Sequence, residues 1–340
     1  MRIEDVKQGM VLSGDIVDDF GTLLLEKGIT LTQAYIMRLQ TIGIRQIPIA
    51  DHYAEALKKE SLISTPLRQE LSLCFRALFS LKAEEILDQK LRSVYMRQLS
   101  TAVDEVIRET AVKLPNIINV QIRLPVADET DHAVNVCLLS VVTGIHLKFP
   151  GTVLRELALG ALLHDLGKSL IPCNKQAAND PGFHCIAGQQ LLRRCGVGLA
   201  AARIAAEHHE AFDGSGYPSG LTHIGIHPLS RVVAITNYFD NALSRARDNN
   251  APRHEILERM LGSGNTAFDL NILRAFCHTV AIYPVGSLVR LNTGQEAYVL
   301  ENQPQFPLRP IVRLMRNNQP AEEVNLVATP KIIIEELIQE

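Results

Sequence analysis

The apolar run Leu157–Leu163 ends directly in the pair His164-Asp165, and this feature constrains the fold more than any other in the sequence. A helix that is apolar on every side is buried, so this helix carries the histidine and the aspartate into the interior of a domain. Adjacent side chains on a helix diverge by about 100°. The histidine can therefore bind one metal ion while the carboxylate reaches towards a second ion.

The sequence on both sides of this pair predicts a mainly α-helical chain. From residue 128 to about residue 278 the apolar pattern is helical. Residues 54–112 contain no glycine and one proline, and their apolar positions recur three and four residues apart. Within them, Ala83–Ala111 is predicted to form one long helix or two helices in series. Loops are predicted at 149–151, 179–182 and 213–227.

The first 50 residues predict a small β-rich unit, because short apolar runs alternate with turn residues. The hairpin is followed by one short amphipathic helix with an N-capping threonine. The predicted elements are apolar runs at Met10–Leu12 and Asp15–Val17, a turn at Asp18–Gly21, a returning strand at Thr22–Glu26, a helix at Gln33–Ile42 capped by Thr32, and a strand at Gln46–Ile49.

The composition changes again near the C-terminus. Leu288–Leu291, Glu296–Leu300 and Pro310–Leu314 are separated by Asn, Gly, Gln and Pro, which is typical of a small antiparallel sheet, and a short apolar tail follows at Lys331–Ile338. The predicted layout is a β-rich unit at 1–52, a helical linker at 53–120, a helical domain at 121–282 and a second β-rich unit at 283–340.

Composition restricts the classes of partner. The net charge is −3 and no dense basic run occurs, so a nucleic-acid polymer is not expected to bind. The six cysteines are scattered without a C-x-x-C pair, which favours free thiols in a reducing compartment. The apolar stretches are shorter than the roughly 20 residues that span a bilayer, and the N-terminus lacks a signal-peptide core. We therefore expect a cytoplasmic protein without membrane insertion.

Histidines recur at positions suited to a metal site. A lone histidine on an apolar helix is more often a core residue than a ligand, and a single His-Asp pair is usually accidental. Several such positions in order, followed by a glycine-rich run, favour a shared site. Imidazole and carboxylate ligands without thiolate suit Fe, Mn, Zn, Co or Ni. The candidate ligands are Asp128 and His132, four residues apart on one helical face, then His164, Asp165, His184, His208 and His209.

The run Asp213–Leu221 follows the last histidine pair closely. Its three glycines permit positive φ angles and a close approach of the backbone to a ligand. Tyr217 offers a flat face for a purine, and Pro218 stiffens the loop. A plain surface loop is the default interpretation of such a cluster. Its position four residues after His209 favours a wall of a substrate site.

These residues resemble the HD-GYP family, bacterial cyclic di-GMP phosphodiesterases within the HD superfamily of metal-dependent phosphohydrolases. The resemblance covers roughly residues 128–276 and implies an HD-type helical bundle. The N-terminal segments Gly9–Leu12 and Leu24–Gly28 also resemble the leader of such proteins. The matching segments are Leu162–Pro172, His184 with Gly188, Glu207–Glu210, Asp213–Pro218 and Arg231–Ile235.

The resemblance implies a role for each matching position. Asp165 bridges the metal ions, and Lys168 contacts the scissile phosphate. Asp128 matches an acidic position that some members use for a third ion. The implied metal ligands are His132, His164, Asp165, His184, His208 and His209, and the implied substrate contacts are Lys168, Asp213, Gly216, Tyr217, Pro218, the second acid Asp240 and, allowing one inserted residue, Arg247.

One position departs from the family pattern. The last metal-binding aspartate of the family is Asn237 here, a neutral and poorer ligand for a hard cation. Asp240, three residues later, is expected to compensate in part. The chain is thus either an active enzyme with a modified site or a catalytically silent cyclic di-GMP receptor or adaptor. An HD phosphohydrolase for another nucleotide is a third interpretation, against which the intact Tyr217-Pro218 run argues.

The enzyme interpretation implies metal-dependent hydrolysis of cyclic di-GMP to pGpG, and to GMP if a second hydrolysis follows. Two divalent ions are expected, or three if Asp128 binds one. Iron or manganese is favoured, with zinc, nickel and cobalt as alternatives. Signalling proteins such as diguanylate cyclases, or a second copy of the chain, are candidate protein partners.

Overall fold

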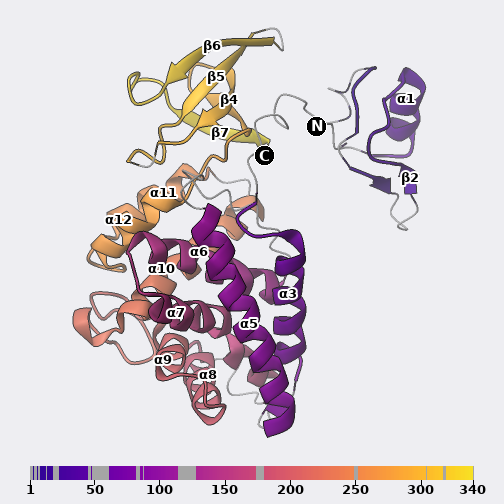
Figure 1. Cartoon of the computed structure of the whole chain (residues 1–340). Coiled ribbons are helices and arrows are strands. Elements are labelled where there is room, and N and C mark those ends of the chain that lie inside the picture. The colour runs from indigo at the N-terminus through magenta and orange to yellow at the C-terminus, as the bar shows by residue number, and fades with distance from the viewer. Residues whose placement is uncertain are drawn as a thin grey trace. The chain divides into compact units, whose positions relative to one another are not determined.

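The computed structural model describes residues 3, 6, 8–12, 14–17, 23–44, 47, 61–81, 85–86, 88–113, 128–173, 180–248, 252–303, 305–316 and 319–339. The chain divides into two compact units, Met1–Lys58 and Lys59–Glu340. Figure 1 shows the helices of the larger unit and, in yellow, the sheet that follows them in the chain.

The small unit contains the predicted hairpin and helix. Strand β1 (Ile16–Val17) pairs with β2 (Leu23–Leu25) in antiparallel fashion. Helix α1 (Gln33–Thr41) begins after Thr32, whose side chain accepts a hydrogen bond from the backbone N–H of Tyr35, so the predicted cap is confirmed. The predicted turn Asp18–Gly21 lies outside the described residues, as does the strand Gln46–Ile49 apart from Ile47. The core of this unit consists of Ile3, Val6, Leu12, Ile16, Leu31, Ile36, Leu39 and Ile47.

The larger unit is mainly helical, which confirms the predicted class. Helices α3 and α5 lie side by side and pack against α6 and α7, so the segment expected to be a linker shares its apolar face with the bundle (Figure 1). The elements are α3 (Thr65–Phe79), α5 (Gln89–Lys113), α6 (Glu129–His146), α7 (Gly151–Leu163), η3 (Leu166–Cys173), α8 (Phe183–Arg194), α9 (Leu199–Glu207), η5 (His223–Gly225), α10 (Pro228–Asp248), α11 (His254–Gly262) and α12 (Leu270–Thr279).

Helix α6 lies within the bundle because most of its length is apolar, and α7 packs against it through its apolar second half. In α6 every residue from His132 to Gly144 is buried. In α7 the apolar run predicted from sequence, Leu157–Leu163, is buried apart from the half-buried Leu159. A side chain at Gly160 would meet the Cδ1 atom of Ile204 at 2.3 Å, so the glycine allows α7 to approach α9 closely. This approach brings the C-terminal ends of α7 and α9 together.

The C-terminal sheet has five antiparallel strands in the order β6-β5-β4-β3-β7. Strands β3 (Leu288–Leu291), β4 (Glu296–Glu301) and β5 (Ile311–Arg316) confirm the three predicted strands. The sequence did not predict β6 (Gln319–Asn325), which contains Pro320 and two glutamates and lies at the sheet edge. The apolar tail supplies the other edge strand, β7 (Ile334–Gln339), which pairs with β3.

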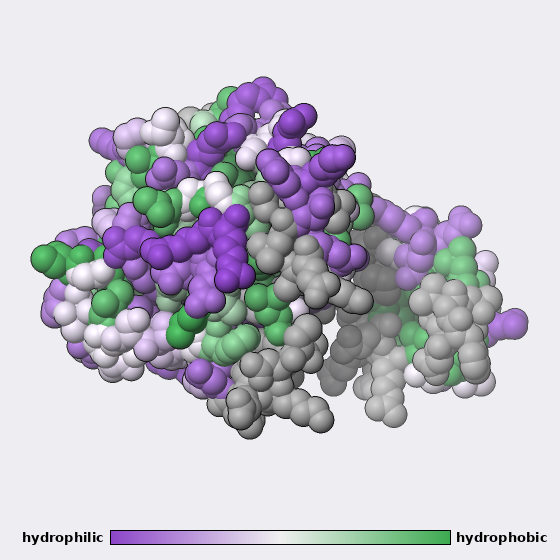
Figure 2. Space-filling model, turned by 90° about the horizontal axis from the view of Figure 1, so that it is seen from below, coloured by the Kyte–Doolittle hydropathy of each residue, from purple (hydrophilic) through white to green (hydrophobic). Residues whose placement is uncertain are grey.

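No helix within the described part of the chain is both long enough and apolar enough to cross a membrane. On the face that Figure 2 shows, hydrophilic residues lie between the hydrophobic ones wherever described residues form the surface.

Candidate metal centre

The ends of several helices bring the predicted histidines together around Asp165. Helix α6 supplies one histidine from its first turn, and α8 supplies another in the same way. The C-terminal ends of α7 and α9 supply the two adjacent pairs. The residues that converge are His132, His164, Asp165, His184, His208 and His209, of which all but the half-buried His209 are fully buried.

The carboxylate of Asp165 lies between two pairs of imidazoles. Its Oδ2 atom lies 3.2 Å from Nε2 of His164 and 3.8 Å from Nε2 of His132. Its Oδ1 atom lies 3.4 Å from Nε2 of His184 and 3.4 Å from Nε2 of His208. Each carboxylate oxygen therefore faces its own pair of imidazole nitrogens.

Three of these imidazoles are held by hydrogen bonds at Nδ1, which orients Nε2 towards Asp165. This pattern is typical of metal-ligating histidines, whose second nitrogen binds a carboxylate or a backbone carbonyl. The acceptors are Oδ2 of Asp240 for His132 at 2.7 Å, the carbonyl of Ala161 for His164 at 2.7 Å, and the carbonyl of Ala205 for His208 at 3.0 Å.

Three buried polar atoms of the cluster have no hydrogen-bond partner among the described residues. They are Nε2 of His132, Nε2 of His164 and Oδ1 of Asp165. A buried polar atom left unpaired costs about 1–3 kcal/mol, so such atoms are rare unless a ligand satisfies them. Divalent cations satisfy both lone-pair nitrogens and a carboxylate oxygen, and the residues present fit that requirement.

The ionisation states of the side chains in the cluster also suit the binding of a cation. Burial by itself raises the pKa of Asp165, but the imidazoles of His164 and His208 outweigh it and hold that pKa well below its usual value. Burial lowers the pKa of His208 to about 4 and, together with the neighbouring His208, lowers that of His209 to about 2. The carboxylate is thus ionised and these imidazoles are neutral at pH 7, which are the forms that bind metals.

Lys168 lies at the exposed edge of the cluster. Its Nζ atom is 2.7 Å from Oδ2 of Asp165 and 3.2 Å from Oε2 of Glu129. Burial by itself lowers the pKa of Lys168, but the two carboxylates outweigh it and raise the pKa above its usual value. The side chain is 31% exposed, so the ammonium group can reach a ligand from solvent.

Two predicted acidic residues have other roles. Asp240 is completely buried, one of its oxygens accepts a hydrogen bond from Asn135 and the other contacts His132, so both oxygens are engaged within the protein and its contact with substrate stays a prediction. Asp128 is the N-cap of α6 and pairs with Arg76 at 2.9 Å. Asp128 therefore lies outside the cluster. Its spacing of four residues from His132 predicted a ligand, but the same spacing also matches an N-cap followed by the first turn of a helix.

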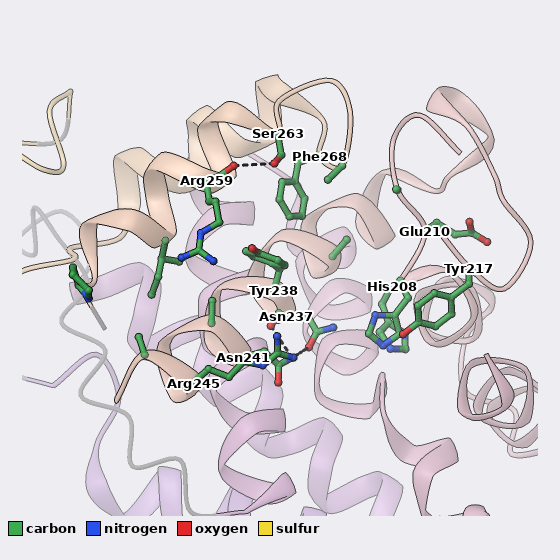
Figure 3. Close-up of a pocket in the computed structure, with 18 residues that line it drawn as sticks. His208, Glu210, Tyr217, Asn237, Tyr238, Asn241, Arg245, Arg259, Ser263 and Phe268 are labelled. Carbon is green, nitrogen blue, oxygen red and sulfur yellow. Dashed lines mark hydrogen bonds between the residues drawn. The ribbon is translucent and has the colours of Figure 1, made fainter. Parts of the chain in front are cut away.

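Asn237 is buried beside the cluster but its oxygen is already engaged. The Nδ2 group of Asn241 donates to Oδ1 of Asn237 at 2.8 Å (Figure 3). An amide oxygen that accepts this bond has one lone pair fewer for a cation. The side chain of Arg247 lies outside the described ones, whereas Arg245, two residues earlier on α10, lines the adjacent cavity.

The glycine-rich loop is fixed against the histidines. The ring of Tyr217 stacks on His209 with centroids 4.7 Å apart, and its backbone N–H donates to the carbonyl of His209. A side chain at Gly216 would lie 2.1 Å from the backbone nitrogen of Ala211, so only glycine fits. Asp213 is exposed and accepts from the N–H of Ser215, so it shapes the loop.

The buried Glu210 also fixes the loop, and the sequence analysis did not assign it. Its carboxylate accepts backbone hydrogen bonds from Ser219 at 2.8 Å and from Leu221 at 3.0 Å. Pro218 packs close to Gly182 on the other side. The available signal was an acidic residue directly after a histidine pair and before a glycine-rich run, where a buried carboxylate can bind the loop backbone.

A cavity of about 570 Å³ opens beside the histidines. His208, His209, Tyr217 and Asn237 are among the residues that line it, and Figure 3 shows Arg245 and Arg259 at the end away from His208 and Tyr217. Tyr238 and Phe268 also line it and contact each other edge to face, with centroids 5.2 Å apart. Guanidinium groups and aromatic faces together suit a ligand that carries phosphates and planar bases.

One thiol also belongs to this cluster, although the sequence analysis assigned none. The Sγ atom of Cys185 lies 3.5 Å from Nε2 of His184. Together with the ligand nitrogens of His184, His208 and His209, it forms a group whose atoms all lie within 4.8 Å of one another. Burial raises the pKa of this thiol to about 12. The scattered cysteines gave no C-x-x-C signal, but Cys185 directly follows a predicted ligand.

Two family models match separate segments of this chain. Residues 117–272 match the model of the HD domain, and residues 288–340 match the model of a KOW domain associated with the HD domain. The first segment contains the candidate metal centre, and the second contains the five-stranded sheet.

Curated relatives match this chain over different shares of its length. The cyclic di-GMP phosphodiesterase PA4108 of Pseudomonas aeruginosa is 31% identical in an alignment 317 positions long that covers 83% of this chain and 76% of that protein. The cyclic di-GMP phosphodiesterase response regulator RpfG of Xanthomonas campestris is 38% identical over 26% of this chain and 27% of its own. The 3'3'-cGAMP-specific phosphodiesterase 3 of Vibrio cholerae is 30% identical over 36% of this chain and 29% of its own.

Proposed function

Since the chain belongs to the HD-GYP family of HD-domain proteins, we propose that it is a metal-dependent phosphodiesterase that hydrolyses cyclic di-GMP to linear pGpG. The observation that carries this proposal is the carboxylate of Asp165 between two pairs of imidazoles, with buried polar atoms that have no hydrogen-bond partner among the described residues. The catalytic part is residues 121–282, and the β-rich ends, 1–52 and 283–340, are accessory units.

Two divalent ions fit the donor set. His132, His164 and Oδ2 of Asp165 would hold one ion. Oδ1 of Asp165 with His184, His208 and His209 would hold the other. When bound, two such ions supply Lewis acidity towards the phosphate and an activated water. Iron or manganese is the proposed metal, and zinc, nickel and cobalt also suit imidazole and carboxylate ligands.

A third ion is not part of this proposal. The only acidic residue predicted to bind it, Asp128, caps α6 and pairs with Arg76. Moving its carboxylate to a metal would remove the hydrogen bonds it accepts from Thr130 and Asp131. Loss of such a cap costs about 1 kcal/mol, which a third ion would have to offset.

The remaining polar groups suit the two ends of a cyclic dinucleotide. The ammonium of Lys168 lies 2.7 Å from Asp165, which supports a role in neutralising the oxygens of the scissile phosphate. The Tyr217 ring, stacked on His209, offers its outer face to a base. Arg245 and Arg259 at the far end of the cavity suit the second phosphate, because a guanidinium donates two parallel hydrogen bonds to it.

The substrate is proposed to be cyclic di-GMP because PA4108, which matches most of this chain, is named for that activity. Other relatives are named for 3'3'-cGAMP, which carries the same cyclic backbone with a different base. Base preference would then depend on the cavity wall around Tyr238 and Phe268 rather than on the metal ligands. The product is pGpG, or GMP if the linear dinucleotide is cut again.

A second candidate function is binding of cyclic di-GMP without hydrolysis. The observation that favours it is Asn237, which is neutral and whose oxygen accepts a hydrogen bond from Asn241. A site with one carboxylate fewer holds divalent ions more weakly, so nucleotide binding in the cavity could persist without turnover.

A measurement of turnover distinguishes the enzyme from the receptor. The protein is purified anaerobically and loaded with Fe²⁺ or Mn²⁺, and cyclic di-GMP, 3'3'-cGAMP and pGpG are followed by chromatography. The enzyme proposal expects the cyclic di-GMP peak to be replaced by pGpG, and D165N to be inactive. Absence of turnover with every metal, combined with calorimetric binding of cyclic di-GMP, would support the receptor instead. Absence of both would contradict both proposals.

A further inference from the structure

The thiol of Cys185 lies inside the cluster that faces Oδ1 of Asp165. Its sulfur is 3.5 Å from Nε2 of His184, and the imidazole nitrogens of His208 and His209 lie within 4.8 Å of it. The side chain of Cys185 is completely buried, so its sulfur does not contact solvent. The separation from three ligand nitrogens is the size of a gap that one cation would fill.

We propose that the sulfur of Cys185, as a thiolate, is a direct ligand of the ion held by His184, His208 and His209. This inference rests on the metal-dependent function proposed above and concerns the composition of its second ion position. Binding transfers no electrons: the sulfur lone pair bonds to the ion, and the thiol proton leaves to solvent. A thiol that coordinates a cation loses its proton even where it is neutral without one.

Charge balance favours a thiolate at this position. Two divalent ions would bring four positive charges into a buried site, and among the described residues Asp165 supplies the single carboxylate of the two ligand groups. Asp240 contacts Nδ1 of His132, so its charge would act on an ion only through the imidazole. Uncompensated charge in a buried site is costly. A thiolate at Cys185 would add a second negative charge in direct contact with the ion.

A buried cysteine is usually a small apolar core residue, and this chain contains examples. Cys137 and Cys277 are also buried, but neither belongs to a ligand group in the described part of the chain. Cys185 differs because three imidazoles of the candidate centre surround its sulfur. The two ordinary cysteines therefore provide controls of the same chemistry and similar burial.

The proposal predicts that the two ion positions differ in metal preference. The position with His132, His164 and Asp165 has nitrogen and oxygen donors. The position with Cys185 adds sulfur, which favours Fe²⁺, Co²⁺ or Zn²⁺ over the harder Mn²⁺ and Mg²⁺. Of the two metals favoured for the enzyme, iron rather than manganese suits this second position.

Cobalt provides a spectroscopic test that does not depend on activity. Full-length protein is stripped with a chelator and titrated with Co²⁺, and the near-ultraviolet sulfur-to-cobalt charge-transfer band is recorded. The band should appear with the wild-type protein and with C277S but not with C185S. Outer ligand partners typically change metal affinity about 10–100-fold, so loss of a direct ligand should weaken the second Co²⁺ by at least about tenfold. A band of equal intensity in C185S would overturn the proposal.

X-ray absorption of the zinc-loaded wild-type protein covers the case in which C185S does not fold. A sulfur scatterer at about 2.3 Å supports the proposal, and a shell of nitrogen and oxygen alone overturns it. Turnover of cyclic di-GMP is measured on the same preparation loaded in turn with Fe²⁺, Mn²⁺ and zinc, and absence of turnover means absence with all three. Turnover without a sulfur ligand overturns this inference alone, whereas a sulfur ligand without turnover contradicts the enzyme proposal alone.

Discussion

The Oδ2 atom of Asp240 lies 2.7 Å from Nδ1 of His132, and both side chains are buried. The other oxygen of Asp240 accepts a hydrogen bond from Asn135 at 3.0 Å, so the carboxylate cannot rotate away. This pair fixes which nitrogen of His132 faces Asp165. We therefore expect Asp240 to act as a positioning residue that affects a bound ion through the imidazole of His132.

The variant D240N tests this relationship. The amide keeps the shape of the side chain but removes the charge that holds the imidazole, so affinity for the first ion should fall about 10–100-fold. Metal affinity is measured by competition with a fluorescent chelator. D104N, which alters an exposed ion pair with Arg155, serves as the control and should bind metal like the wild type. An unchanged affinity in D240N would contradict the positioning role.

Asp165 should matter more than any histidine, because its two oxygens face both ion positions. In D165N the neutral amide can no longer bridge two cations, so the protein should lose both ions under conditions that saturate the wild type. Turnover should fall by at least about 10²-fold, the typical effect of losing one group that stabilises charge in a transition state. Metal analysis and the chromatographic assay report these losses separately. Retention of both ions in D165N would contradict the bridging geometry.

A substitution at Asn237 should have the opposite effect, because restoring a carboxylate there should strengthen metal binding. N237D adds a negative charge beside His208 and should raise metal affinity by about tenfold, which corresponds to about 1.4 kcal/mol. N241A is the companion variant, since it frees Oδ1 of Asn237 without adding charge and should have a smaller effect. Weaker metal binding in N237D would mean that the position does not face an ion.

The burial of His164 and Asp165 was predictable from the sequence, whereas the full set of candidate ligands was implied by the resemblance to the HD-GYP family. An apolar helix that ends in His164-Asp165 is buried whatever surrounds it, and the pair His208-His209 repeats the same arrangement. The hydrogen bond between His132 and Asp240 was not predictable, because it joins positions 108 residues apart. Asp240 was accordingly expected at the substrate.

Cys185 and strand β6 are two further features that could not be predicted from the sequence. A thiol beside one histidine carries no signal until α9 brings two further imidazoles to it, so only the packed bundle reveals the group. Strand β6 has charged residues and a proline in place of an apolar alternation. It forms because β5 offers a free edge, which is a property of the sheet and not of the segment itself.

Acid should destabilise the metal-free protein. Burial lowers the pKa of His208 to about 4, whereas an unfolded histidine titrates near 6.5. Between these values the unfolded chain binds the proton and the folded chain does not, so the free energy of unfolding falls as the pH drops through this window. Each such histidine contributes about 1.4 kcal/mol per pH unit. His209 shifts in the same direction, and His132, whose pKa Asp240 and Asp165 raise against burial, offsets part of the effect.

Urea unfolding with a chelator at pH 7, 6 and 5 measures this dependence. H208N removes one titrating group and should flatten the profile, and H254N, which changes a histidine outside the cluster, serves as the control for replacement of a histidine. Equal stability of the wild type at pH 7 and pH 5 would contradict the neutral state of the buried imidazoles.

Gly216 provides a test of the loop that leaves the metal ligands intact. A methyl group there would lie 2.1 Å from the nitrogen of Ala211 and 2.5 Å from the carbonyl of His209, so G216A must displace the loop and with it the Tyr217 ring. If Tyr217 holds a base, KM for cyclic di-GMP should rise about tenfold, the range of one base–aromatic stack, while bound metal stays constant. G225A is the matched control, because a methyl group there meets its nearest neighbour at 3.9 Å. An unchanged KM in G216A would mean that the loop does not contact the nucleotide, and loss of metal would mean that it supports the histidines instead.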